Sequence, residues 1–228
     1  MIFVKPTMFR FEPIKIANIS DSGDIQLDFK RFISLYEKKC LVEVLGECLY
    51  KDIQDSYTFA DGVFTLKDTA TDAIKHLVNG FDYEAPINNC VITLDFDFYF
   101  PIFSIGCGCG CGSSNCTSRK WRGFIQKEQY LAGTALADYE HSFIADYIYY
   151  HYMLVNRTAT TGTGQTALGS ENGQTVVNTS KRIDRYNEFI FQVIGRKNET
   201  SLYRFLMDNK ADYPTWSPNC NLTFKDKF

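Results

Sequence analysis

The run from Ser142 to Val155, SFIADYIYYHYMLV, limits the folds open to this chain more than any other stretch. Between Phe143 and Val155 only Asp146 and His151 are strongly polar, and five residues are aromatic. Its length predicts a helix, and a helix of this composition has no ordinary solvent-facing side. Such a helix needs other elements around it.

A second, amphipathic helix is predicted over residues 178–194, NTSKRIDRYNEFIFQVI. Ile183, Tyr186, Ile190 and Ile194 recur at helical spacing on one side, while charged residues lie largely elsewhere. Thr179 or Ser180 can cap its start, and Gly195 can end it. The order is therefore helix, long loop, helix.

The loop at 157–177 is polar, with Leu168, Val176 and Val177 as its sizeable apolar residues. Ordering about 20 residues costs on the order of 20–40 kcal/mol, which so few apolar groups do not offset. If the loop is ordered, a neighbour must supply the contacts, for example by pairing with the Thr-rich start, TATTGTGQT, as a strand or hairpin. A mobile surface loop is the alternative.

The N-terminal part contains a predicted arm and two predicted helices. An extended arm is predicted over residues 1–27, because residues 1–20 alternate apolar and charged groups and contain Pro6 and Pro13; a strand packed on its own chain is the alternative. Helices are predicted over about 28–54, with Gly46 able to bend the first, and over 66–81. Residues 91–100 alternate with the period of a strand, and 121–136 fit either a helix or a strand.

Four cysteines lie close together in IGCGCGCGSSNCTSRKW: Cys107, Cys109, Cys111 and Cys116. Four thiolates can close a tetrahedral zinc site. The spacing differs, however, from two separated C-x2-C pairs, and the glycines impose no geometry. A flexible, oxidation-prone loop is therefore the favoured interpretation, with zinc as the alternative, and we expect no cofactor.

Composition and motifs narrow the function classes. The formal net charge of −3 argues against a general nucleic-acid binder, and no apolar stretch reaches the 18 residues of a membrane span. The N-terminus lacks the apolar region of a secretion signal, so we expect synthesis in a reducing cytosol. The sequence contains no phosphate-binding loop, nucleophile elbow or H-E-x-x-H helix.

Candidate catalytic or metal-binding side chains do occur beside the aromatic helix: Glu140, His141, Asp146 and His151. A carboxylate-bridged di-iron bundle requires two Glu-x-x-His pairs on facing helices, and the sequence has none. We therefore expect no enzyme; a small cytoplasmic zinc protein or metalloenzyme is the alternative.

Several segments together resemble a known family. The run FISLYEKKCLVEVLGECLYKDI is similar to the opening helix of head-tail connector proteins, also called neck ring or adaptor proteins, of tailed bacteriophages that infect Bacteroides-type hosts, including crAss-like phages. The aromatic helix, the Thr/Gly/Asn-rich segment, the Tyr186-Asn187-Glu188 helix and SLYRFLMDNKADYPTW follow in the same order. The resemblance covers roughly residues 29–54 and 138–216. The arm, the strand at 91–100 and the cysteine tract depart from it.

The resemblance implies a mainly α fold, a bundle of about four to five helices with a small β element and long extended loops and termini. It implies a connector domain over 28–216, with an insertion at 90–120 and the interface loop at 157–177, followed by a tail at 217–228. It also implies a structural virion protein in the phage neck, made in the host cytoplasm, with no membrane contact. Such proteins form a ring, often twelve-fold, that joins the portal to the tail or to further neck proteins and leaves a channel for DNA. The expected interface residues are Tyr147, Tyr150, Thr161, Thr163, Gln165, Leu168, Trp216 and Phe228.

Overall fold

The computed structural model of the chain describes residues 3–10, 14–16, 24–86, 116–132, 135–155, 158–161, 164–167, 179–195, 200–219 and 221–225. Within these ranges the protein has five α-helices and four two-stranded antiparallel pairs. The predicted fold class, mainly α with a small β element, is confirmed. The predicted strand at 91–100 and three of the cysteines, Cys107, Cys109 and Cys111, lie outside the described residues.

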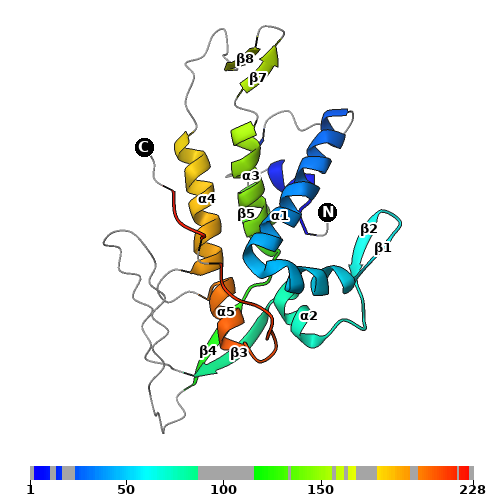
Figure 1. Cartoon of the computed structure of the whole chain (residues 1–228), viewed down its shortest axis with the longest axis vertical. Helices are drawn as coiled ribbons and strands as arrows, with labels where there is room; N and C mark the ends of the chain where they lie inside the picture. Colours follow the sequence, from blue (N-terminus) through cyan, green and yellow to red (C-terminus); the bar gives the residue numbers. More distant parts are fainter. Residues whose placement is uncertain are drawn as a thin grey trace.

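Three helices form the body of the molecule: α1 (Asp24–Asp55), α3 (Phe143–Val155) and α4 (Thr179–Ile194). They lie side by side with α3 between the other two (Figure 1). Every residue of α3 from Phe143 to Tyr150 is buried. The aromatic helix therefore obtains the cover that its sequence demands from α1, α4 and the 3-10 helix η1 (Pro6–Arg10) of the same chain.

Helix α1 changes direction at Gly46, as its sequence predicts. The backbone there is non-helical, with φ 79° and ψ 161°. An added Cβ would meet no other atom within 4 Å, so glycine is required by this conformation and not by crowding. Beyond the bend, α1 ends beside the first strand pair, β1 (Tyr57–Ala60) with β2 (Val63–Leu66).

The second predicted helix is shorter than expected. Helix α2 spans Asp72–Asn79, because Leu66 belongs to β2 and Ala70 N–H closes a turn on Lys67 O. The Thr71 hydroxyl caps α2 by accepting from Ile74 N–H, and Gly80 follows its end as predicted. After Gly80 the chain enters β3 (Phe81–Pro86), which pairs with β4 (Cys116–Trp121).

The region that fitted either a helix or a strand forms strands. It contains β5 (Gln126–Ala132), paired with β6 (Ala135–His141). The long polar segment also contains a strand pair, β7 (Thr158–Thr161) with β8 (Gly164–Ala167), beyond the end of α3 (Figure 1). Its start thus pairs with itself as a hairpin.

The described N-terminal residues pack on their own chain, as in the second alternative, but Pro6–Arg10 form the 3-10 helix η1 and not a strand. Phe3, Val4, Met8, Phe9 and Ile14 are buried in the main core. The buried carboxylate of Glu37 on α1 accepts from Phe3 N–H at 3.1 Å and from Val4 N–H at 2.8 Å. The segment is therefore fixed to α1 by both apolar contact and charge-assisted hydrogen bonds.

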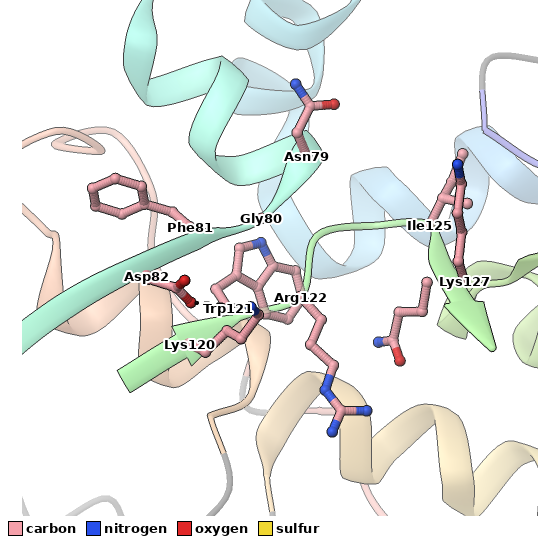
Figure 2. Close-up of a pocket in the computed structure, with 10 residues that line it drawn as sticks. Asn79, Gly80, Phe81, Asp82, Lys120, Trp121, Arg122, Ile125 and Lys127 are labelled. Carbon is pink, nitrogen blue, oxygen red and sulfur yellow. Dashed lines mark ion pairs between the residues drawn. The ribbon is translucent and has the colours of Figure 1, made fainter. Parts of the chain in front are cut away.

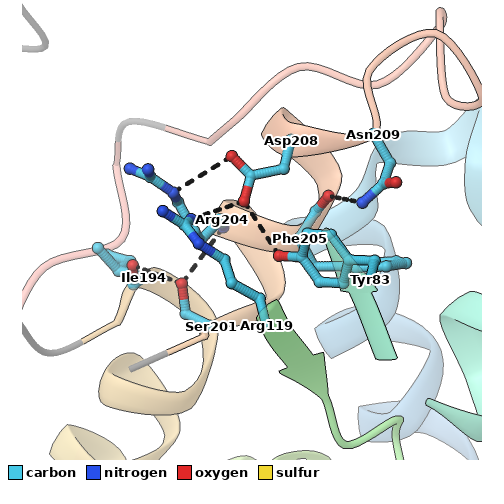
Figure 3. A network of polar contacts seen from close by, with 8 residues as sticks. All are labelled: Tyr83, Arg119, Ile194, Ser201, Arg204, Phe205, Asp208 and Asn209. Atoms are coloured by element: carbon cyan, nitrogen blue, oxygen red, sulfur yellow. Dashed lines mark hydrogen bonds and ion pairs between the residues drawn. The ribbon is translucent and has the colours of Figure 1, made fainter. Parts of the chain in front are cut away.

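Helix α5 (Leu202–Asp208) joins the β3–β4 pair to the helical body through one carboxylate. Asp208 Oδ2 accepts from Tyr83 of β3 at 3.0 Å and from Arg119 of β4 at 2.7 Å, while Oδ1 lies 3.3 Å from Arg204 Nε (Figure 3). Burial and the Asp208 carboxylate raise the pKa of Tyr83 well above its usual value. This shared acceptor fixes the strand pair relative to α5.

Candidate functional site

The predicted interface residues Tyr147, Tyr150 and Trp216 lie inside the protein. Their side chains are 1%, 8% and 3% exposed, respectively. Trp216 Nε1 donates to Val44 O of α1 at 3.4 Å, so the side chain of Trp216 packs on its own chain. All three side chains are therefore buried within the single chain.

The other predicted interface residues belong to the long polar segment and the C-terminus. Thr161 pairs with Gly164, and Gln165 pairs with Thr160, within the β7–β8 hairpin. Thr163, Leu168 and Phe228 lie outside the described residues.

Tyr147 and Tyr150 line a small pocket of about 210 Å³ between α1, α3, α4 and the C-terminal segment. Tyr147 donates its hydroxyl proton to Glu43 Oε2 at 2.7 Å, and burial together with this bond raises the pKa of Tyr147. Burial, with Lys39 and Lys225 nearby, lowers the pKa of His151 to about 4, so this imidazole is neutral at pH 7. The pocket thus holds one anion, two cations and a neutral histidine.

The C-terminal segment covers this pocket. Asn187 of α4 donates to Lys225 O at 3.0 Å and accepts from Lys225 N–H at 2.9 Å. The Lys225 ammonium lies 4.7 Å from the ring centre of Tyr186 and 5.4 Å from that of Tyr150. These contacts are cation–π interactions, and they place the tail of the protein on α4.

Of the four candidate catalytic residues, only His141 and Asp146 meet. His141 Nε2 lies 3.1 Å from Asp146 Oδ2, and Asp146 Oδ1 lies 3.8 Å from Arg185 Nη1. Glu140 instead pairs with Lys5 at 2.9 Å. The cluster links β6, α3 and α4, and Asp146 at its centre is fully buried. Within the described ranges, no three His, Cys, Asp or Glu side chains are grouped to hold a metal ion.

The largest apolar groups left exposed include two at the tip of the β1–β2 hairpin. Phe59 is 64% exposed and Val63 is 61% exposed. The turn Asp61-Gly62, which connects Ala60 to Val63, has φ of 52° and 79°, the two positive values typical of a tight type I′ connection. The sequence indicates a turn around residues 59–62, but the exposed apolar surface formed by Phe59 and Val63 was not among the predicted interfaces.

The base of this hairpin is held in the core. Tyr57 and Leu66 pack against the main cluster, and the Tyr57 ring meets that of Phe3 edge-on at 5.6 Å. Lys67 Nζ donates to Asp55 O at 2.6 Å. The hairpin therefore projects from a fixed base at the end of α1 (Figure 1).

A groove of about 610 Å³ lies where α2, β3, β4 and β5 come together. Figure 2 shows Phe81 and Asp82 on one side, Ile125 and Lys127 on the other, and Trp121 with Arg122 between them. The lining residues are Asn79, Gly80, Phe81, Asp82, Lys120, Trp121, Arg122, Ile125, Gln126 and Lys127. Three of these are cations and one is an anion.

Two glycines shape this groove by close backbone approach. A Cβ on Gly80 would lie 2.6 Å from Trp121 O, and one on Gly123 would lie 2.5 Å from Val78 O. Both have positive φ, 91° and 81°. Trp121 Nε1 donates to Leu77 O at 2.7 Å, which fixes the indole between the two segments.

The charges of the groove are unevenly compensated. Lys120 Nζ pairs with Asp82 at 3.4 Å on the surface. In the described part of the chain, no ion-pair partner is found for Arg122 or Lys127. The groove is therefore a cationic recess with apolar walls on a protein whose net charge is −3.

Comparison with known proteins gives a single finding. Residues 122–225 match a family described as a family of unknown function, DUF6712. The matched segment includes α3, α4, α5 and part of the groove, but not α1 or the β1–β2 hairpin. No curated protein and no solved structure matches the chain. Among the described residues, no helix has the length and apolarity that a membrane crossing requires.

Proposed function

We propose that this protein is a structural subunit of a tailed-phage neck, forming an oligomeric ring, with an expected order of twelve, that joins the portal to the tail and leaves a channel for DNA. The resemblance of residues 29–54 and 138–216 supplies the biological setting. The observation that carries the assembly part is the β1–β2 hairpin, which holds Phe59 and Val63 in water at the end of a base anchored in the core.

Single exposed apolar residues are normal on a monomer, so exposure alone is weak support. Here, however, two large residues occupy the tip of one projecting hairpin whose base is anchored at Tyr57 and Leu66. A fixed base removes much of the ordering cost that a partner would otherwise meet. This arrangement suits insertion into a neighbouring protein.

The β7–β8 hairpin supports the same proposal. An isolated two-stranded hairpin is marginally stable in water, and its edges carry unpaired backbone groups. We assign its open edges to a neighbouring subunit or to the portal, which can add a strand there. In the free subunit its amides should exchange with solvent quickly.

The experiment compares wild-type protein with a variant lacking Thr161–Gln174. Electron microscopy and light scattering, with and without the portal protein of the same phage, should show rings or portal-bound complexes for the wild type. The deletion should leave the thermal unfolding midpoint of the monomer nearly unchanged and abolish assembly.

A deletion in the β1–β2 hairpin is unsuitable as a control, because that hairpin is itself proposed to contact a partner. Replacing Ala211 and Asp212, exposed residues after α5, with serine is the matched control and should leave assembly intact. A wild-type protein that stays monomeric and binds neither portal nor tail protein would refute the proposal.

A further inference from the structure

The β1–β2 hairpin and the cationic groove have complementary chemistry. The hairpin tip offers Phe59 on one face and Val63 on the other, with the Asp61 carboxylate in the turn between the strands. The groove offers apolar walls at Phe81 and Ile125, with Arg122 and Lys127 beside them. One surface is therefore apolar with a negative charge, and the other is apolar with positive charges.

We propose that the hairpin tip of one copy of this chain occupies the groove of the next copy. Asp61 then meets Arg122 and Lys127, and Phe59 lies between the apolar walls at Phe81 and Ile125. This inference deepens the proposed function, on which it rests, by naming the contact that repeats around the ring.

The two surfaces belong to different copies because of how they are placed. The hairpin leaves the end of α1 and its tip points away from the β3–β4 pair (Figure 1). Its base is fixed by the packing of Tyr57 and Leu66. The tip of one chain therefore does not fold back into its own groove.

A tip that enters a different surface on the next molecule makes a heterologous, head-to-tail contact. Contacts of this kind generate closed rings when the rotation between copies closes, and open filaments when it does not. Charge complementarity sets the register of such a contact and disfavours wrong pairings. The proposed contact thus fits a cyclic assembly.

The test uses full-length chains at millimolar concentration, where sedimentation equilibrium detects weak self-association. Asp61→Lys reverses the charge of the hairpin tip, and Lys127→Glu reverses one charge of the groove. Each should weaken association at least tenfold relative to wild type. Asp68→Lys and Lys38→Glu make the same charge changes at exposed positions outside the two surfaces, and should associate as wild type does.

Mixing gives the decisive result. In an equimolar mixture of the Asp61→Lys and Lys127→Glu chains, Asp61 of one chain meets the intact groove of the other, and the new lysine meets the new glutamate, so the mixture should assemble although neither chain does so alone. The double variant, with both changes in one chain, should regain assembly because the charges are exchanged.

The outcomes separate this inference from the proposed function. If wild type assembles and both single variants assemble equally well, the inference is overturned and the ring proposal stands. If the mixture stays monomeric, the inference is overturned. If Lys127→Glu associates as wild type does but no longer binds a duplex oligonucleotide, the groove has another occupant and the inference is also overturned. If wild type neither self-associates nor binds portal, both proposals fail.

Discussion

Glu37→Ala is the most informative single change for the stability of the subunit, because one carboxylate fixes the N-terminal segment. Glu37 Oε2 accepts from the backbone N–H groups of Phe3 and Val4, both of which are buried. No other acceptor for those two groups is found in the described part of the chain. Removing the carboxylate takes the acceptor away from two buried N–H groups.

A buried donor that loses its acceptor costs about 1–3 kcal/mol, so two such donors cost about 2–6 kcal/mol. Removing a buried charge returns some of its desolvation penalty, which moves the expected loss toward about 2–4 kcal/mol. Against a typical total of about 5–15 kcal/mol, this loss is large. Glu37→Gln keeps an oxygen acceptor but loses the charge, and should cost about 1–2 kcal/mol.

Urea unfolding of the monomer, followed by far-ultraviolet circular dichroism, measures both losses. Glu47→Ala, at an exposed position on the same helix, is the control and should change stability by less than about 0.5 kcal/mol. Deleting residues 1–16 should destabilise the subunit at least as much as Glu37→Ala. If Glu37→Ala and the deletion both unfold with wild-type midpoints, the segment is an arm for a neighbour and does not stabilise its own chain.

Three further outcomes are expected. Acidification from about pH 6.5 to pH 4 should reduce stability, because unfolded His151 takes up a proton that the folded imidazole does not, and His151→Gln should remove that part of the pH dependence in calorimetry. Gly80→Ala should cost about 2–5 kcal/mol by denaturant unfolding, since its Cβ meets Trp121 O, whereas Gly62→Ala, at a similar φ in open space, should cost about 1–2 kcal/mol. A chelator should leave the thermal midpoint nearly unchanged, and stoichiometric zinc with a large loss of stability would instead assign a metal site to the cysteine tract at 107–116.

The helices were predictable because their signals are local. The spacing of Ile183, Tyr186 and Ile190 indicated α4, and Gly46 indicated the bend in α1, since each depends on nearby backbone geometry. The start of α2 was missed because the hairpin takes Leu66 into β2, and a cross-strand partner is invisible to a helical pattern. The strand β5 was undecided for the same reason, and the part of β6 beyond residue 136 was not predicted.

The interface was harder to predict. An apolar helix must be buried, but its sequence does not say whether the same chain or another subunit packs against it. The sequence showed that the helix of Tyr147 and Tyr150 needs neighbours, and we assigned part of that need to other subunits. The structure meets it with α1, α4 and η1. The hydrogen bond between Tyr147 and Glu43 joins residues that are 104 positions apart, so no local sequence pattern predicts it.

The strength of the proposed contact follows from how little apolar surface is left. Fully burying a Phe or Val side chain contributes roughly 1.5–3 kcal/mol, so covering the exposed fractions of Phe59 and Val63, 64% and 61%, contributes about 1–2 kcal/mol each. Association itself costs about 4–15 kcal/mol, so one tip in one groove cannot hold two subunits at micromolar concentration. Closure of the ring, or a portal that holds the subunits together, raises their effective concentration and makes the same contacts sufficient. If the proposed function holds, the free protein should therefore be monomeric when dilute and should form rings only when the portal is present.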